Sequence, residues 1–161
     1  MNEQRELTEL PRDEALRLLC SVPFGRVVFT ARALPAIRPV NHLVDCDQVV
    51  IRASLLSALS QDVDGQGAVV AYEADLIDPA TRLGWSVVVV GRAARVGDSP
   101  AREQYRQQLR PWVAGERDEV ISISADLVNG YRLVPQARLA PPGLADPSGL
   151  ADPSGSGQQT V

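Results

Sequence analysis

The order of apolar and polar positions predicts a chain built mainly from β-strands. Segments rich in Val and Ile alternate with short polar or Gly/Pro connections along most of the sequence. Branched side chains favour strands because they pack well on a pleated, half-buried surface. The predicted strands are residues 26–31, 36–44, 48–53, 67–75 and 85–96, and the apolar segments 119–128 and 131–135 close the ordered part.

Three helical segments interrupt this pattern. Residues 11–20 carry Pro at the first helical position, acidic residues in the first turn and then an apolar stripe. A second helix begins after Ser99, which is a good N-cap residue, and one of its faces carries Tyr105, Leu109 and Trp112. A short helix is predicted for residues 54–61. Strands joined by short links, with few helices between them, predict a mainly β fold with helices (α+β), arranged as an antiparallel barrel with the helices outside.

The composition changes near residue 135. Residues 1–135 are therefore expected to form one domain, and residues 136–161 a disordered tail rich in Gly, Pro, Ser and Asp. The hexamer GLADPS occurs twice in this tail, at 143–148 and 149–154. The repeat is too short and too polar to build a solenoid, and we expect no catalytic role for it.

Composition and charge exclude several kinds of protein. The net charge is −4 and the sequence pI is about 5.0, which argues against non-specific nucleic-acid binding. All 16 basic residues are Arg, so a lysine Schiff base and a P-loop lysine are both excluded. The polar N-terminus predicts no signal peptide, and no apolar run reaches membrane-spanning length. Two isolated Cys residues form no CxxC pair and, with a single His, no plausible zinc set. We expect a cytoplasmic protein with no membrane or nucleic-acid partner.

Strand periodicity separates the polar residues of the segment 37–53 into two sets. In the strand 36–44, Val40, His42 and Val44 share one face, and Asn41 lies on the other. Arg52 lies at the end of the next strand, just before Ser54 and the predicted short helix. A guanidinium beside free N–H groups at a helix start could hold a phosphate, whereas on position alone a solvent-facing strand end is the more ordinary interpretation.

Three further features each allow a functional and a structural interpretation. His42 is the only histidine, and a lone His in a strand is more often a hydrogen-bonded structural residue than a base. Glu73 and Asp75 could act as acid and base, although a charge cluster at a strand end is the more common arrangement. In GWSV, residues 84–87, Trp85 offers a flat face and Ser86 a small hydrogen-bonding group, but a Trp that closes the end of a barrel is equally consistent.

From about Leu7 to Val134 the chain resembles the pyridoxamine 5′-phosphate oxidase-like flavoproteins, which are FMN-binding split barrels. The resemblance rests on the order and spacing of several short motifs. They are Leu18-Leu19, Gly25-Arg26, Pro39-Val40-Asn41, Ile51-Arg52-Ala53, Tyr72-Glu73-x-Asp75, Gly84-Trp85-Ser86-Val87 and Gly91-Arg92-Ala93. Each is weak alone, whereas their succession over nearly the whole domain is fairly specific.

The resemblance implies a homodimer that binds FMN at the subunit interface. In such proteins one strand lies along the isoalloxazine ring, a following segment holds the phosphate and ring edge, and a Trp-Ser element approaches the flavin. Carried over to this sequence, the implied cofactor-binding residues are Arg38, Pro39, Val40, Asn41, Arg52, Ala53, Ser54, Ser57, Ala58, Trp85 and Ser86.

The phosphate segment departs from the family pattern. Leu56, Ser57 and Ala58 stand where Gly-Thr-Lys is common, and Ala53 replaces a Thr. Loss of a cation and a hydroxyl would weaken FMN binding by roughly 2–4 kcal/mol unless Arg52, Ser54, Ser57 and either Arg38 or Arg92 compensate. The resemblance implies an FMN-dependent oxidoreductase with an unknown small-molecule substrate. The alternatives are a non-catalytic dimeric binding or regulatory module with a degraded flavin site, or a protein that binds a deazaflavin or haem, for which His42 is the only imidazole ligand.

Overall fold

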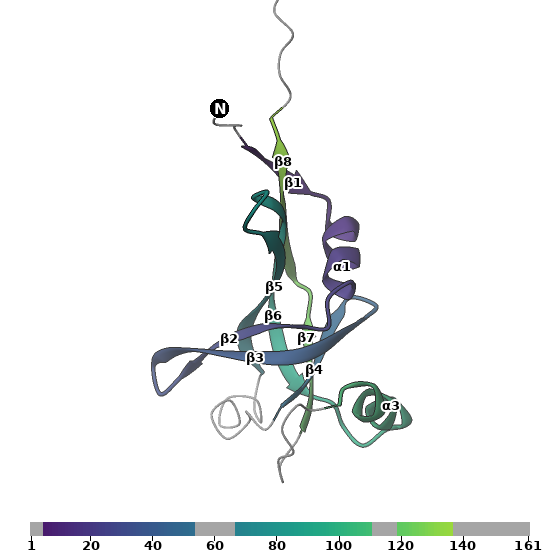
Figure 1. Cartoon of the computed structure of the whole chain (residues 1–161). Coiled ribbons are helices and arrows are strands. Elements are labelled where there is room, and N and C mark those ends of the chain that lie inside the picture. Colours follow the sequence, from purple (N-terminus) through teal and green to yellow (C-terminus); the bar gives the residue numbers. More distant parts are fainter. Residues whose placement is uncertain (1–4, 54–66, 111–118, 137–161) are drawn as a thin grey trace, which may run out of the picture.

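The computed structural model describes residues 5–53, 67–110 and 119–136. Eight strands and two helices occur in this part of the chain (Figure 1). In chain order they are β1 (Arg5–Leu10), α1 (Arg12–Cys20), β2 (Phe24–Ala31), β3 (Leu34–Asp45), β4 (Gln48–Ala53), β5 (Ala68–Asp78), β6 (Leu83–Arg95), α3 (Pro100–Gln108), β7 (Glu119–Ser124) and β8 (Leu127–Pro135).

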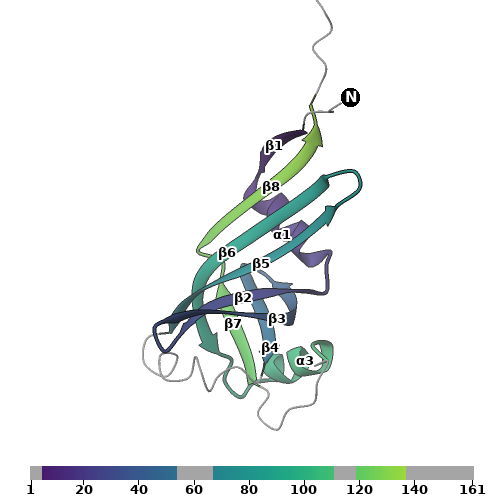
Figure 2. The ribbon, with the colours of Figure 1, turned by 60° about the vertical axis from the view of Figure 1, so that its left-hand side comes forward.

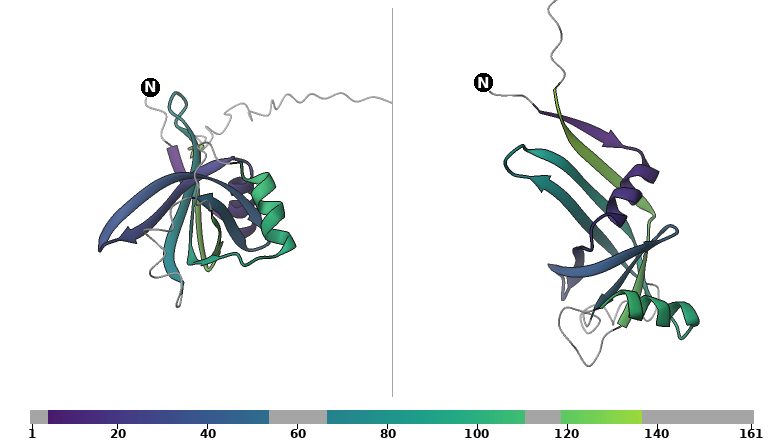
Figure 3. Two further views of the ribbon diagram at one scale, coloured as in Figure 1. Left: turned by 90° about the horizontal axis from the view of Figure 1, so that it is seen from below. Right: turned by 45° about the vertical axis from the view of Figure 1, so that its right-hand side comes forward.

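The sheet closes into a six-stranded antiparallel barrel. Strand order is β1-β8-β6-β5-β2-β3-β4-β7, and an additional pairing of β6 with β7 joins the two ends of the barrel portion. Strands β8 and β1 remain outside the closure and extend the sheet away from the barrel, as Figure 2 shows. Helix α1 lies along β8, and α3 packs at the opposite end of the molecule, beside the barrel (Figures 1 and 3).

Closure depends on a change of partner along β6. Residues 84–90 of β6 pair with β8, and residues 93–95 pair with β7. Gly91 lies between these two stretches, and a Cβ atom there would come within 1.6 Å of the Ser124 carbonyl oxygen. The backbone of β7 can approach β6 this closely only because Gly91 has no side chain.

The apolar core fills the barrel and continues under α1. Alternate residues of β5 and β6 point inward, so that the strand period of two separates core from surface. The largest fully buried side chain is that of Tyr72, and Leu19 attaches α1 to the same cluster. A smaller second cluster joins Val50 and Val120 to Leu109 at the end of α3.

The predicted fold class is confirmed, and each predicted strand in the described residues is found. Two features of the strands were not predicted. Residues 5–10 form β1 although the sequence there is polar and acidic, because β8 offers a complete antiparallel partner to this edge strand. The apolar segment 119–128 is also divided, with β7 ending at Ser124 and β8 beginning at Leu127.

Some predictions fall on parts of the chain outside the description. The short helix at 54–61 and Trp112 lie outside the described residues, as does the predicted tail beyond residue 136. Ser99 is confirmed as the N-cap of α3, where its side chain accepts a hydrogen bond from the Arg102 backbone N–H. Within the described ranges, neither helix is long and apolar enough to cross a membrane.

Substitution of Gly91 by Ala tests the closure. The new methyl group would collide with backbone atoms rather than a flexible side chain, so we expect the free energy of unfolding to fall by about 3 kcal/mol or more. Gly97→Ala is the matched control, because a Cβ at that position meets nothing within 4 Å. We expect Gly97→Ala to stay within about 0.5 kcal/mol of the wild type in urea unfolding. Equal stabilities for the two variants would contradict this account of closure.

Candidate functional site

The outer face of the sheet carries a continuous apolar row across five strands. Register places Leu127 beside Val90, Val90 beside Ala71, Ala71 beside Val28 and Val28 beside Ile37. The two ends of this row are largely exposed, with 62% of Leu127 and 56% of Ile37 accessible to solvent. An apolar row whose ends are exposed is a candidate contact surface.

A polar row runs next to the apolar row on the same face. Arg26 of β2 forms ion pairs with Glu73 and Asp75 of β5 at 3.1 and 3.3 Å. Pro39 lies opposite Arg26 in the register, and Ser86 lies opposite Asp75. The carboxylates are thus engaged as a charge cluster, which is the structural interpretation of this pair. Sequence reasoning did not single out Arg26 as the residue that joins them, although the Gly25-Arg26 motif marked its position.

Asn41 and Arg52, from neighbouring strands, meet at the C-terminal end of α3. Arg52 Nη1 donates to the carbonyl oxygens of Arg106 and Leu109 at 2.9 and 3.2 Å. Asn41 Nδ2 donates to the carbonyl oxygen of Arg110 at 2.7 Å. The structure therefore brings together two of the predicted cofactor residues. Each of them also has a structural role, because it binds carbonyl oxygens at the end of α3.

Asn41 also presents an unsatisfied acceptor. Its Oδ1 atom is buried and has no hydrogen-bond partner among the described residues. Rotation of the amide would not help, because Oδ1 would then face the Arg110 carbonyl oxygen. A buried acceptor without a donor costs about 1–3 kcal/mol.

Pro39 and Ser86 lie on the polar row, whereas Trp85, Val40 and Arg38 do not share the outer face. Trp85 is only 7% exposed and belongs to the core, so the interpretation of a Trp that packs inside the protein fits its position. Val40 packs against the same core, and Arg38 alternates onto that side of β3, where its Nη1 donates to the neighbouring Ile37 carbonyl oxygen. Ala53 ends β4 opposite Glu119. The remaining predicted residues, Ser54, Ser57 and Ala58, lie outside the described residues.

His42 lies on the inner side of β3 and has a structural role. Its Nε2 is 2.8 Å from the Leu19 carbonyl oxygen, and its Nδ1 is 2.8 Å from the Tyr72 hydroxyl. A neutral imidazole satisfies both contacts, with Nε2–H donating to the Leu19 carbonyl oxygen and Nδ1 accepting from the Tyr72 hydroxyl. Burial lowers the pKa of His42 and raises that of Tyr72. His42 could ligate a haem only by giving up one of these bonds, so it offers no ready ligand for the haem alternative.

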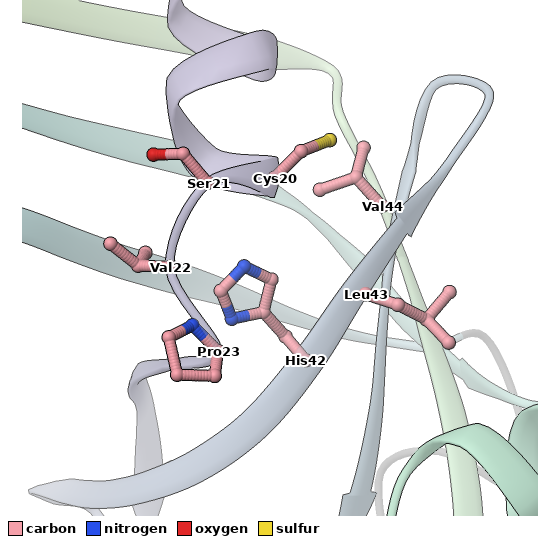
Figure 4. A pocket seen from close by; sticks show the side chains of 7 residues that line it. All are labelled: Cys20, Ser21, Val22, Pro23, His42, Leu43 and Val44. Atoms are coloured by element: carbon pink, nitrogen blue, oxygen red, sulfur yellow. The ribbon is translucent and has the colours of Figure 1, made fainter.

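A pocket lies beside His42. It measures about 370 Å³ and lies between the end of α1, the Ser21–Pro23 connection and β3. Figure 4 shows the imidazole on the side of this connection and Leu43 on the opposite side of the strand. Among the described residues, no group of three or more His, Cys, Asp or Glu side chains could hold a metal ion.

A family model described as pyridoxamine 5′-phosphate oxidase matches residues 11–138. The chain belongs to this family. The match covers the barrel, α1 and α3, and it confirms the resemblance drawn from the short motifs.

Relatives in this family are similar along most of their length. An uncharacterized protein of Mycobacterium tuberculosis is 52% identical over 133 residues, which cover 81% of this chain and 88% of that protein. A candidate pyridoxamine 5′-phosphate oxidase from Corynebacterium glutamicum has a solved structure with 28% identity and a TM-score of 0.62, covering 79% of this chain and 98% of that one. A protein from Mycobacterium smegmatis described as FAD-binding has 27% identity and a TM-score of 0.58, with the same two coverages.

The buried His42 predicts a pH dependence of stability. Its pKa is lower in the folded state than the unfolded value of about 6.5, so the unfolded chain binds more protons as the pH falls through that value. Unfolding free energy should then decrease from pH 7.5 toward pH 5.5, with a slope that approaches but does not exceed about 1.36 kcal/mol per pH unit for this group. Urea unfolding across that range measures it.

His42→Gln is the control for this pH dependence. Gln can also donate to Leu19 and accept from Tyr72, but it does not titrate. We expect its stability to be nearly constant over the same range. Parallel curves for the two proteins would mean that His42 is not the titrating group.

Proposed function

We propose that this protein is an FMN-dependent oxidoreductase that acts on a small molecule and binds its cofactor at the interface of a homodimer. Membership of the family and a 27% identical relative described as FAD-binding support a flavin. The observation that carries the proposal is the position of Asn41 and Arg52. Two residues that the resemblance assigns to the flavin come from different strands and meet beside a buried, unsatisfied acceptor.

The residues present fit the polar edge of a flavin. The oxidised isoalloxazine ring has an imide N–H, and Asn41 carries a side-chain amide whose Oδ1 has no donor among the described residues. Arg52 supplies a guanidinium suited to a phosphate group. When bound, FMN supplies the transfer of electrons or hydride. The chain's own residues would orient and bind the cofactor. Pro39 and Asn41 orient the ring, Arg52 binds the negative charge of the phosphate, and contact between the subunits excludes water.

The apolar row supports the homodimer. Its five residues, Leu127, Val90, Ala71, Val28 and Ile37, lie beside Pro39 and the Arg26 ion pairs. A second copy placed on this face would bury the exposed ends of the row and cover the polar row next to it. The cofactor edge would thereby be enclosed by two chains, which a single sheet face cannot do.

A non-catalytic module of the same fold is the second candidate. Two observations favour it: Arg52 Nη1 already bonds α3, and Leu56, Ser57 and Ala58 replace the family's Gly-Thr-Lys. A module of this kind would form the same dimer without affinity for FMN. Titration with FMN therefore separates the two candidates, and a deazaflavin titrated in parallel identifies the third possibility.

Arg52→Ala tests the phosphate contact. A charged hydrogen bond contributes about 1.5–3 kcal/mol, so FMN affinity should fall at least tenfold. Fluorescence titration of FMN, with the melting temperature recorded in the same samples, measures this. Arg17→Ala removes an equally basic side chain from the exposed face of α1 and should bind like the wild type. Unchanged affinity in Arg52→Ala would place the phosphate elsewhere.

Leu127→Glu tests the dimer. A carboxylate at the end of the apolar row would be buried without a partner in the proposed interface, and each dimer would contain two of them. Sedimentation equilibrium should show dimers for the wild type and monomers for Leu127→Glu at micromolar concentration. Arg17→Glu, with a similar change of charge on α1, should remain dimeric. A monomeric wild type would refute the interface.

A further inference from the structure

The C-terminal end of α3 is held by hydrogen bonds from side chains of the barrel wall in addition to a small apolar contact. Within the helix itself, Pro100–Gln108, no residue is buried. Side chains of the barrel wall donate hydrogen bonds to three carbonyl oxygens at this end. Arg52 donates to those of Arg106 and Leu109, and Asn41 donates to that of Arg110. The guanidinium also complements the negative end of the helix dipole.

Apolar packing and a further hydrogen bond also attach this end of α3 to the barrel, and the Tyr105 ring packs against the same small cluster as Leu109. Leu109, which follows the helix, is 3% exposed and packs against Val50 and Val120. The Tyr105 hydroxyl donates to Asp45 Oδ2 at 2.5 Å, and this bond raises the pKa of Tyr105. Because this apolar contact is small, the local stability of the helix end is low. Loss of the Asn41 or Arg52 hydrogen bonds should therefore let this end separate from the barrel while the rest of the fold stays intact.

The same bonds restrict the two wall residues. With Nδ2 on the Arg110 carbonyl, the Asn41 amide has one orientation, and its Oδ1 is the acceptor that remains unsatisfied. Arg52 loses most of its rotamer freedom when Nη1 bridges two carbonyl oxygens. A ligand that uses these side chains meets them already ordered, as long as α3 is docked.

We propose that α3 is the positioning element of the cofactor wall, so that docking of its C-terminal end and binding of FMN strengthen each other through Asn41 and Arg52. This inference rests on the proposed function, in which those two residues contact FMN. Leu109 and Tyr105 are then positioning residues, since they hold α3 without contacting the cofactor. Because coupling between two equilibria is reciprocal, FMN must also stabilise the docked helix.

Leu109→Ala loosens α3 without altering either wall side chain. In this variant FMN would have to order the wall side chains itself. Ordering one flexible side chain costs about 0.5–1.5 kcal/mol of binding free energy, so FMN affinity should fall about three- to tenfold. Leu10→Ala removes a buried Leu at the end of β1, which Figure 1 shows far from α3, and should leave FMN affinity unchanged. In an Asn41→Ala/Arg52→Ala background, Leu109→Ala should cause no further loss, because no side chains remain to be oriented.

Amide hydrogen exchange of α3 without ligand provides the second measurement. Asn41→Ala and Arg52→Ala should each raise exchange rates in residues 105–109 severalfold and leave α1 unchanged, whereas Arg17→Ala should change neither. Added FMN should slow exchange at 105–109 in the wild type but not in the double variant.

The outcomes separate the two proposals. If the wild type does not bind FMN, the proposed function fails, while the exchange of the ligand-free variants still decides whether Asn41 and Arg52 hold α3. If the wild type binds FMN but Leu109→Ala binds equally well, or loses the same affinity in both backgrounds, the coupling is overturned and the proposed function stands. Unchanged exchange in both Asn41→Ala and Arg52→Ala would also overturn it.

Discussion

The arrangement of the whole molecule depends on one close approach between backbones, at Gly91. Strand β6 pairs with β8 before this residue and with β7 after it. The first pairing extends the sheet and creates the outer face on which Leu127 and Val90 lie. In the second pairing β7, which also pairs with β4, closes the barrel. This closure places Arg52 of β4 beside α3. The surface and the polar corner are therefore consequences of a single change of partner.

The alternation of β3 gives neighbouring residues opposite roles. His42 points inward, where it connects α1 to Tyr72 of β5 through two hydrogen bonds. Gly25 belongs to the same inner arrangement, because a Cβ at that position would lie 2.6 Å from the Tyr72 hydroxyl. Asn41, one residue earlier, points outward to α3. The density of polar residues in this strand thus reflects two separate needs: an internal hydrogen-bond network and an outer wall.

Much of this organisation could be predicted from the sequence, because it follows from strand periodicity. The separation of Val40, His42 and Val44 from Asn41, and the structural interpretation of His42, required only the period of two and base frequencies of buried His. The contacts of Asn41 and Arg52 could not be predicted, since they join β3 and β4 to a helix more than 50 residues away. The burial of Trp85 and the formation of β1 likewise depend on tertiary partners that no local pattern reveals.

The contacts of Arg52 and Asn41 also change what their presence in the sequence means. Since both residues hold α3, a relative that had lost its cofactor would still need them for the fold. Their conformity to the family's motifs is therefore weaker support for a flavin than it first suggests. Stability of the isolated barrel gives no reason for two other features: a buried Asn41 acceptor without a donor among the described residues, and an apolar row with exposed ends beside Pro39. A second subunit on this face would cover the apolar row, which is a feature that the bonds to α3 do not explain.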